Sequence, residues 1–279
     1  MTLKCFKNLP IALLACGLVS THPAFSQTEN TDKFVPAIED NSMFIEEAYN
    51  QEERVVQHIS NLVFLPNLED NFYYSFTQEW PVFSIKHQLS YSLQYTSLNK
   101  GKSTGLGDIM LNYRYQLSYK QDFAACSPRI SLIIPTGNEK KGLGNGSWGM
   151  QICLPISKRW SNQFVTHLDL GTTYLFKVKQ DDIGFNRSMW GYYGGFSTIW
   201  LLSANFNLML ECLTTFTPTP QINNKVTYSN TSLLAPAFRY AINFKNLQIV
   251  PGLSLPFTLT EDSKTEMGAM VYLSFEHGF

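Results

Sequence analysis

The sequence has little charge, few cysteines and, beyond residue 26, no long apolar run. Charged residues make up 15% of the 279 residues and the formal net charge is −1. This balance gives no electrostatic reason to expect nucleic acid as a partner. No window of about eighteen apolar residues follows residue 26, which excludes a conventional transmembrane helix there.

Cysteine chemistry is equally limited. Cys126, Cys153 and Cys212 are the cysteines beyond residue 26. Their odd number and wide spacing argue against a disulfide framework, and no cysteine has the spacing of a metal site. No glycine-rich phosphate loop precedes a predicted helix. We therefore expect neither a metal nor a cofactor.

What the chain does contain is strict alternation of apolar and polar residues. Every second residue from Ile109 to Leu117 is apolar, and the residues between them are polar or Met110. The same pattern runs from Phe83 to Thr96. A period of two over this length indicates a strand with one apolar and one polar face. Long strands of this kind, with 14% aromatic residues in the chain, predict an all-β fold, an antiparallel transmembrane β-barrel with lipid outside and water inside.

The first residues carry the pattern of an export signal. Lys4 and Lys7 precede an apolar stretch over 9–19, and small residues around Ser26 form a cleavage site. We expect residues 1–26 to be a signal peptide cleaved after Ser26. The alternative is a lipobox at Leu13–Cys16, which would make Cys16 a lipidated N-terminus. Either signal exports the chain, and together with the alternating strands it predicts the bacterial outer membrane.

Residues 27–56 precede the first predicted strand. Residues 27–41 are polar and without a pattern, whereas Phe44, Ala48 and Val55 fall near helical spacing after a capping Asn41 or Ser42. We expect a short amphipathic helix around 42–56. Such a helix could plug the barrel from the periplasmic side or lie against its rim, and the sequence does not choose between these positions.

Residues 57–279 should form the barrel. Turn residues and alternation predict about twelve strands, an even number that places both termini on the periplasmic side. Long loops are expected at 97–106, 136–146, 177–186, 217–230 and 259–266. The predicted strands lie near 56–65, 71–80, 83–96, 107–119, 126–135, 147–157, 163–176, 187–201, 203–216, 231–243, 246–258 and 267–279.

Two further features concern the strands. The chain ends on Phe279 after an alternating apolar strand, which is typical of clients of the barrel-assembly machinery, a predicted partner. Pro236 and Pro251 fall inside predicted strands. Because proline removes a ladder hydrogen bond, we expect bulges there, or places where the wall opens sideways.

Placing each apolar face outward puts a set of charged residues inside. The set holds five acids and four bases, so no ring of one sign selects ions. These charges either brace a narrow barrel by pairing or line the path of a solute. The predicted lumen-lining residues are Glu79, Lys86, Asp108, Arg114, Arg129, Asp169, Glu211, Arg239 and Glu276.

Several short motifs resemble a known family. G-L-G-D at Gly105–Asp108, L-I-I-P-T-G-N at Leu132–Asn138 and G-L-G-N-G-S at Gly142–Ser147 resemble the outer-membrane barrels of the MetA pathway of phenol degradation, also described simply as transporters. Ile45–Glu52 and Ser75–Val82 resemble the N-terminal half of a related subgroup. The resemblance implies passage of small, often hydrophobic compounds across the outer membrane, and it brings no catalytic residues. Within these motifs, Asp108 is the residue of most functional interest.

Two other functions remain as alternatives. His58–Asn61 matches the H-x-S-N pattern of an outer-membrane phospholipase, but Leu62 stands where that family has glycine. A closed structural or adhesive barrel would use its loops, above all 217–230. We expect a channel that is not an enzyme and that passes small hydrophobic or aromatic molecules, with outer-membrane lipid and the solute as partners.

Overall fold

A computed structural model describes residues 42–65, 71–119, 122–260 and 265–278. These residues belong to one compact unit that spans residues 35–279. The predicted signal peptide, the lipobox alternative at Cys16, the polar stretch 27–41 and Phe279 all lie outside the described residues.

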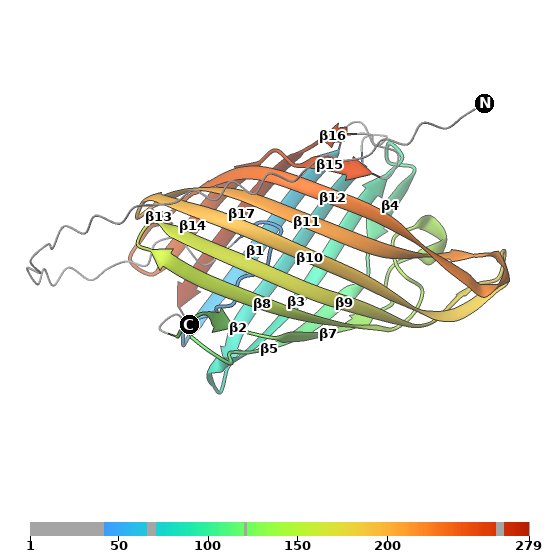
Figure 1. Cartoon of the computed structure of the whole chain (residues 1–279), viewed down its shortest axis with the longest axis horizontal. Coiled ribbons are helices and arrows are strands. Elements are labelled where there is room, and N and C mark those ends of the chain that lie inside the picture. The colour runs from blue at the N-terminus through green and yellow to red at the C-terminus, as the bar shows by residue number, and fades with distance from the viewer. Residues whose placement is uncertain (1–41, 66–70, 120–121, 261–264, 279) are drawn as a thin grey trace, which may run out of the picture. The chain divides into compact units, whose positions relative to one another are not determined.

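The fold is a closed antiparallel barrel (Figure 1). Over the described residues the ladder forms twelve wall strands, some of which consist of two labelled strands in line. The first six are β1 (Val55–Leu65), β2 (Asn71–Val82), β3 (Ser84–Leu98), β4 with β5 (Ser103–Leu106, Ile109–Tyr115), β6 with β7 (Ala125–Cys126, Arg129–Ile134) and β8 (Gly149–Ser161). The other six are β9 (Phe164–Gln180), β10 (Phe185–Ser203), β11 (Phe206–Gln221), β12 with β13 (Lys225–Tyr240, Ile242–Asn243), β14 with β15 (Leu247–Ser254, Phe257–Thr260) and β16 with β17 (Thr265–Met267, Ala269–Gly278).

The barrel closes where its first and last strands meet. β1 pairs with β2 on one side and with β17 on the other, and the second register runs from Val55 opposite Gly278 to Phe64 opposite Ala269. The described connections contain two short 3-10 turns, η1 (Glu139–Lys141) and η2 (Ile222–Asn224). No helix among the described residues is long and apolar enough to cross a bilayer.

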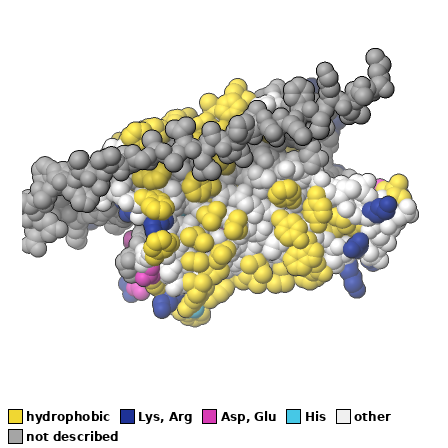
Figure 2. All heavy atoms as spheres, in the orientation of Figure 1, with side chains coloured by type: hydrophobic (Ala, Val, Ile, Leu, Met, Phe, Trp, Pro, Cys, Tyr) yellow, Lys and Arg dark blue, Asp and Glu magenta, His cyan; other side chains and the backbone are white. Residues whose placement is uncertain are grey.

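The predicted alternation of faces is present in the wall. Ile199 is fully buried while the next residue, Trp200, is 54% exposed, and the same alternation runs along β8 to β11. Cys153 is buried and Cys212 is exposed, as their parity predicts. Figure 2 shows hydrophobic side chains spread over the visible outer face, with charged side chains gathered toward the two ends. The wall is therefore apolar outside and largely polar inside.

The predicted long loop at 217–230 is wrong. β11 continues to Gln221 and β12 begins at Lys225, so the two strands stay paired up to η2. The error has a physical cause. Thr, Val and Tyr favour extended backbone, but Pro218 and Pro220 stand in this stretch, and proline argues against a strand in the sequence because it removes a ladder hydrogen bond.

Both prolines interrupt the ladder on one side. Pro236 is in register opposite Leu210, and Pro251 is in register opposite Leu273. On their other sides the pairing breaks: β12 pairs with β15 up to Leu234 and with β14 from Ala237, and the pairing of β14 that stops at Gly252 resumes at Ile249. At the first break the backbone N–H of Leu255 donates to the Pro236 carbonyl at 3.1 Å. The predicted irregularity is therefore present at both prolines.

The predicted helix around 42–56 is also wrong. Residues 42–54 form bends and one turn, and β1 begins at Val55. The backbone N–H groups of this segment donate to side chains of the barrel wall. In an α-helix the same groups would donate to carbonyls four residues earlier. The wall therefore replaces the hydrogen bonds that a helix would have made.

An outward-facing charge tests the membrane wall. Leu111 lies in the middle of β5 and is exposed on the apolar face. Arginine at such a depth should destabilise the barrel by about 2–4 kcal/mol because it must leave water for hydrocarbon. We expect Leu111→Arg to lower the urea midpoint of refolding into lipid vesicles, while Leu111→Met leaves it nearly unchanged. Equal midpoints would contradict the assignment of this face to lipid.

Candidate functional site

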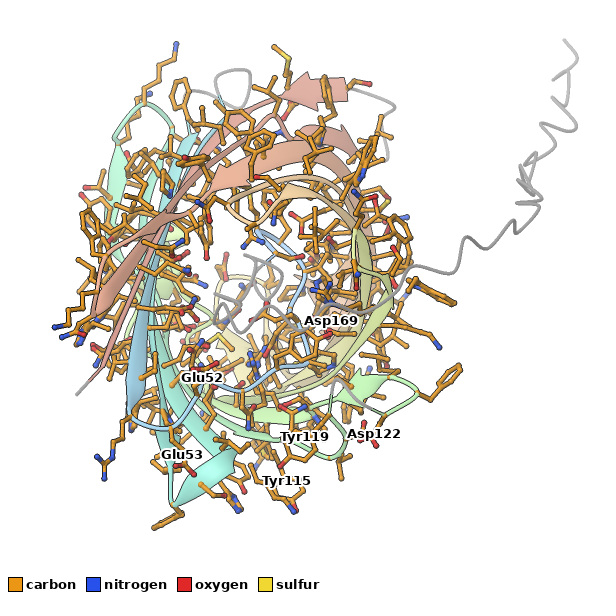
Figure 3. All side chains as sticks on the ribbon, turned by 90° about the vertical axis from the view of Figure 1, so that its left-hand side faces the viewer. Glu52, Glu53, Tyr115, Tyr119, Asp122 and Asp169 are labelled. Atoms are coloured by element: carbon orange, nitrogen blue, oxygen red, sulfur yellow. The ribbon has the colours of Figure 1, made fainter. Side chains whose placement is uncertain are left out.

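The most informative feature of the interior is the segment of residues 42–54, hereafter the inner segment. Figure 3 looks along the barrel and shows Asp169 pointing into the ring of strands. Met43, Ile45 and Ala48 of the inner segment are buried. Two glycines make room for it: a Cβ at Gly195 would lie 2.1 Å from Ile45 Cδ1, and one at Gly252 would lie 2.6 Å from Met43 Cε.

A buried carboxylate of the wall holds the start of the inner segment. Glu211 on β11 accepts hydrogen bonds from the successive backbone N–H groups of Met43, Phe44 and Ile45 at 3.1–3.4 Å. Successive N–H groups that converge on one anion form a nest, which stabilises negative charge. Ser42 adds a hydroxyl bond to Ser197 at 2.9 Å. The nest therefore compensates a carboxylate that is fully buried.

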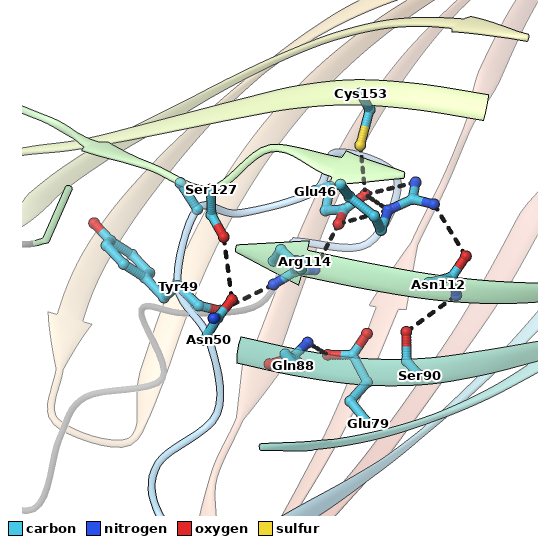
Figure 4. Close-up of polar contacts among 12 residues, drawn as sticks. Glu46, Tyr49, Asn50, Glu79, Gln88, Ser90, Asn112, Arg114, Ser127 and Cys153 are labelled. Atoms are coloured by element: carbon cyan, nitrogen blue, oxygen red, sulfur yellow. Dashed lines mark hydrogen bonds and ion pairs between the residues drawn. The ribbon is translucent and has the colours of Figure 1, made fainter. Parts of the chain in front are cut away.

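The next contact reverses the charges, with the acid on the inner segment and the bases on the wall. Glu46 accepts from Arg129 Nε at 2.8 and 2.9 Å, and Arg114 Nη2 donates to Glu46 Oε1 at 2.6 Å (Figure 4). Cys153 Sγ donates to the same carboxylate at 3.3 Å. Arg114 also donates to the Tyr49 carbonyl at 3.0 Å. One carboxylate thus joins β5, β7 and β8 through the inner segment.

Electrostatics keep Glu46 ionised. Burial alone would raise the pKa of this carboxyl, but the charges of Arg129 and Arg114 outweigh it and hold the pKa at about 2. Because the pKa of Glu46 in the folded state lies below its ordinary value, the pairing stabilises the folded state fully above about pH 4.5. This stabilisation is lost as the pH falls toward 2. At Glu47 burial outweighs the neighbouring positive charge, and the pKa of this carboxyl is raised well above its usual range.

Neutral side chains complete the attachment of the inner segment. Gln116 donates to the Ala48 carbonyl at 2.6 Å and accepts from the Asn50 N–H at 2.8 Å. Gln88 accepts from the Gln51 N–H at 2.7 Å and donates to Glu79 at 2.8 Å. Met43 also belongs to a buried apolar cluster with Val165 and Ile199, so polar contacts and apolar packing together hold the inner segment.

Ser157 and His167 form a pair that the sequence analysis did not identify. They face each other across β8 and β9, with Ser157 Oγ 2.6 Å from His167 Nδ1, and the Ala48 N–H donates to the same hydroxyl at 2.8 Å. Both side chains are almost completely buried beneath the inner segment. The pair therefore supports the segment and is closed to a substrate.

The predicted lumen residues fall into two groups. Those with little exposure are Glu79, Asp108, Arg114, Arg129, Asp169, Glu211 and Arg239. Two residues differ. Lys86 has the parity of the buried Gln88, but its side chain is exposed near the beginning of β3. Glu276, near the end of β17, is half-buried and accepts from Gln57 Nε2 at 2.7 Å. Glu46 gathers Arg114 and Arg129 into one cluster, while Glu211 lies at a separate contact with the inner segment. That any of them lines the path of a solute stays a prediction.

Asp108 holds a loop in place. It lies between β4 and β5 and accepts from Gly137 N at 3.0 Å, Asn145 N at 2.7 Å and Asn145 Nδ2 at 2.9 Å. Gly144 passes so close that a Cβ there would lie 2.4 Å from Asp108 Oδ1. Asp108 of the first motif thus binds the backbone of the other two, which lie largely in the loop of residues 135–148 between β7 and β8.

The described residues enclose cavities in the interior, of which two adjoin the contacts above. The first, of about 360 Å³, borders the inner segment and the inward faces of β1, β2, β3 and β5, and its lining includes Glu46, Asn61 and Thr77. The second, of about 340 Å³, lies between the loop of residues 135–148 and β9 to β11. Leu175 and Tyr193 are part of its lining. Both volumes are in the range of small-molecule sites.

The phospholipase-like motif His58–Asn61, hereafter the lipase-like motif, does not form a catalytic pair. His58 Nε2 lies 3.2 Å from His277 Nε2, and the hydroxyl of Ser60 contacts that of Tyr74 at 3.3 Å. A serine nucleophile would need its histidine within hydrogen-bond reach. In the described residues His58 and Ser60 each contact a different partner, so they do not form the pair that a serine nucleophile needs.

One group of side chains has donor atoms close enough for a metal ion. Atoms of Glu46, Cys153 and Asp169 lie within 4.8 Å of one another. Both carboxylate oxygens of Glu46 are bound by guanidinium groups, however. A cation would have to displace these two positive charges, so the cluster fits an ion pair better than a metal.

Comparisons with known proteins bear on the fold. No family model matches the chain, and no curated protein matches it. An outer membrane channel from Pseudomonas putida F1 has a similar structure, with a TM-score of 0.62 and 11% identity over 85% of this chain and 100% of that chain. The NanC porin aligns with a TM-score of 0.53 and 6% identity over 80% of this chain and 100% of that chain.

These observations define a class. A closed antiparallel wall with an apolar outside and a polar inside is an outer-membrane β-barrel, and the two solved structures share this fold. The chain is located in the bacterial outer membrane. The MetA-pathway resemblance stays a prediction, because the comparisons support the barrel fold and not that family.

Removing the Glu46 carboxylate should loosen the inner segment. Breaking a buried pair leaves the guanidinium groups uncompensated, which costs about 3–5 kcal/mol. We expect Glu46→Ala to accelerate hydrogen exchange at the amides of Met43–Ile45 while the strands stay protected. Glu53→Ala, at an exposed acid of the same segment, is the control. Unchanged exchange in Glu46→Ala would show that the pairing does not hold the segment.

Asp108 should matter for the loop of residues 135–148. Asparagine has one acceptor oxygen in place of two, so Asp108→Asn should leave a loop N–H without its partner at a cost of about 1–3 kcal/mol. We expect faster tryptic cleavage after Lys140 and Lys141. Asp181→Asn, at an exposed turn, should not change the rate. Equal cleavage in both variants would contradict the loop-holding role.

Proposed function

We propose that this barrel is a gated channel that passes small molecules across the outer membrane without chemical change. The observation that carries the proposal is the inner segment, because it occupies the interior without belonging to the wall. Apolar packing holds part of it, because Met43 and Phe44 pack in the inner apolar cluster of the wall. The rest of the attachment consists of ion pairs and hydrogen bonds to wall side chains, contacts that can be exchanged for water when the segment moves.

The cavities support a small solute. The cavity beside the loop of residues 135–148 is lined by Leu175, Val178, Met189 and Tyr193, with Glu139 and Asn145 at its loop side. The cavity beside the inner segment is lined largely by charged, hydroxyl and amide side chains, such as Arg114, Thr77 and Asn61. A solute that crosses both must accept apolar and polar surroundings in turn. We propose small aromatic or otherwise amphipathic molecules, in keeping with the family resemblance.

The alternatives have less support. The serine and histidine of the lipase-like motif contact other partners, and the buried Ser157–His167 pair is covered by the inner segment. A permanently closed structural barrel differs from a gated channel in one property. It passes no solute even when the inner segment is free to move.

Locking the inner segment to the wall tests the gate. Ser42 Oγ and Ser197 Oγ are 2.9 Å apart, so the double variant Ser42→Cys with Ser197→Cys should form a disulfide. In vesicles that carry the full chain, we expect the flux of benzenesulfonate, an aromatic anion that crosses bare lipid slowly, to fall in the oxidised variant to the level of protein-free vesicles. Reduction with dithiothreitol should restore it.

The single variants Ser42→Cys and Ser197→Cys serve as controls, because they change the same side chains without the cross-link. Flux that persists in the oxidised double variant would contradict gating by the inner segment. Absence of flux in the wild-type chain and in every reduced variant would contradict the channel itself and favour the closed barrel.

A further inference from the structure

We propose that Arg114 and Arg129 form the binding site for the carboxylate of the transported solute, and that Glu46 occupies this site in the closed barrel. This inference rests on the proposed channel function and names the chemical class of its solute: a small organic acid. The site belongs to the wall, whereas the carboxylate that now fills it belongs to the inner segment.

The geometry is that of carboxylate recognition. Arg129 contacts Glu46 through Nε at 2.8 and 2.9 Å and through Nη2 at 2.8 Å, and Arg114 adds a contact at 2.6 Å. Two nitrogens of one guanidinium group on one carboxylate give a bidentate arrangement, which is strong and orientation-specific. Nothing in this set of contacts depends on the rest of the glutamate side chain, so a free carboxylate can make the same bonds.

The supporting contacts keep the two guanidinium groups in place. Arg129 Nη1 donates to Asn112 at 3.2 Å and contacts Ser131, and Arg129 Nη2 donates to Gln151 at 3.0 Å. All three partners come from the wall strands β5, β7 and β8. These contacts do not involve the inner segment, so they can hold Arg129 when Glu46 leaves.

Charge balance then decides what replaces Glu46. Arg114 is buried, and the Arg129 side chain is 12% exposed. When the inner segment moves, the two positive charges lose their main counter-charge, and leaving them unpaired in the interior would be costly. A neutral solute cannot compensate them, whereas a carboxylate can. The site therefore favours an acid over its neutral analogue at the moment of opening.

The neighbouring cavity provides room and further contacts for the rest of such a solute. It has a volume of about 360 Å³ and includes Glu46, Arg114 and Arg129 in its lining. Asn61 Oδ1 and Arg114 Nε are buried and have no hydrogen-bond partner among the described residues. An unused acceptor in the cavity lining and an unused donor at the arginine pair are what a partly polar ligand would satisfy.

Binding of two matched probes to the full chain in detergent tests the proposal. Benzoate and benzamide have nearly the same shape and differ in charge. In wild-type protein, benzoate must compete with a tethered carboxylate. In Glu46→Gln the competitor loses its charge, so benzoate should bind more tightly by about tenfold or more, measured by isothermal titration calorimetry, whereas benzamide should bind equally in both. Glu53→Gln is the matched control.

A variant that also removes one arginine identifies the binding site. Adding Arg129→Gln to Glu46→Gln should abolish the gain for benzoate, because the bidentate partner is lost. If Glu46→Gln binds benzoate no more tightly than wild type, or if the gain survives in the double variant, the proposal is wrong.

A measurement on the wild-type chain does not depend on any variant folding. Saturating benzoate should accelerate hydrogen exchange at the amides of Met43–Ile45 and Asn50 by displacing Glu46, and benzamide should not. Equal exchange with both probes would overturn the proposal. These readouts need no transport. Benzoate binding at the arginines without flux of any solute would overturn the channel function alone, and flux without charge-selective binding would overturn this inference alone.

Discussion

Burial of polar groups inside a closed wall is the constraint on which this structure depends. Strict alternation sends every second side chain inward, and the outer face must remain apolar for lipid. The interior consequently collects carboxylates, guanidinium groups and amides that are far from bulk water, and each needs a partner. The wall satisfies some of them across neighbouring strands, as Gln88 does for Glu79. Glu211 and the pair of Arg114 and Arg129 instead find their partners on the inner segment.

This constraint also explains why the inner segment has no regular secondary structure. Its backbone donors are consumed by Glu211, Ser157, Gln116 and Gln88 at positions fixed by four different wall strands or their ends. A helix would turn its N–H groups inward on itself and leave those wall groups without donors. The extended, bent path is therefore imposed by the barrel, and it brings Glu46 to the two guanidinium groups.

The sequence predicted the wall well because alternation is a local signal. The parity of Arg114 and Cys153 follows from their strands alone, and both side chains are buried as expected. The inner segment could not be predicted in this way. The positions of Phe44 and Ala48 resemble helical spacing by coincidence, and the partners of Glu46 are 68 and 83 residues away. The inward glycines, such as Gly195, were a usable signal of space left for another part of the chain. The same limit applies to Lys86, whose parity is right but whose place near a strand end leaves its side chain exposed.

The closure of the barrel has a consequence for how the inner segment can move. The segment leads directly into β1, and β1 completes the wall by pairing with β17. The C-terminal end of the segment is therefore tethered at this seam, so a displaced segment stays joined to the barrel and can return to the same wall side chains. Glu46 remains close to the two guanidinium groups even after it leaves them, and its effective concentration there stays high.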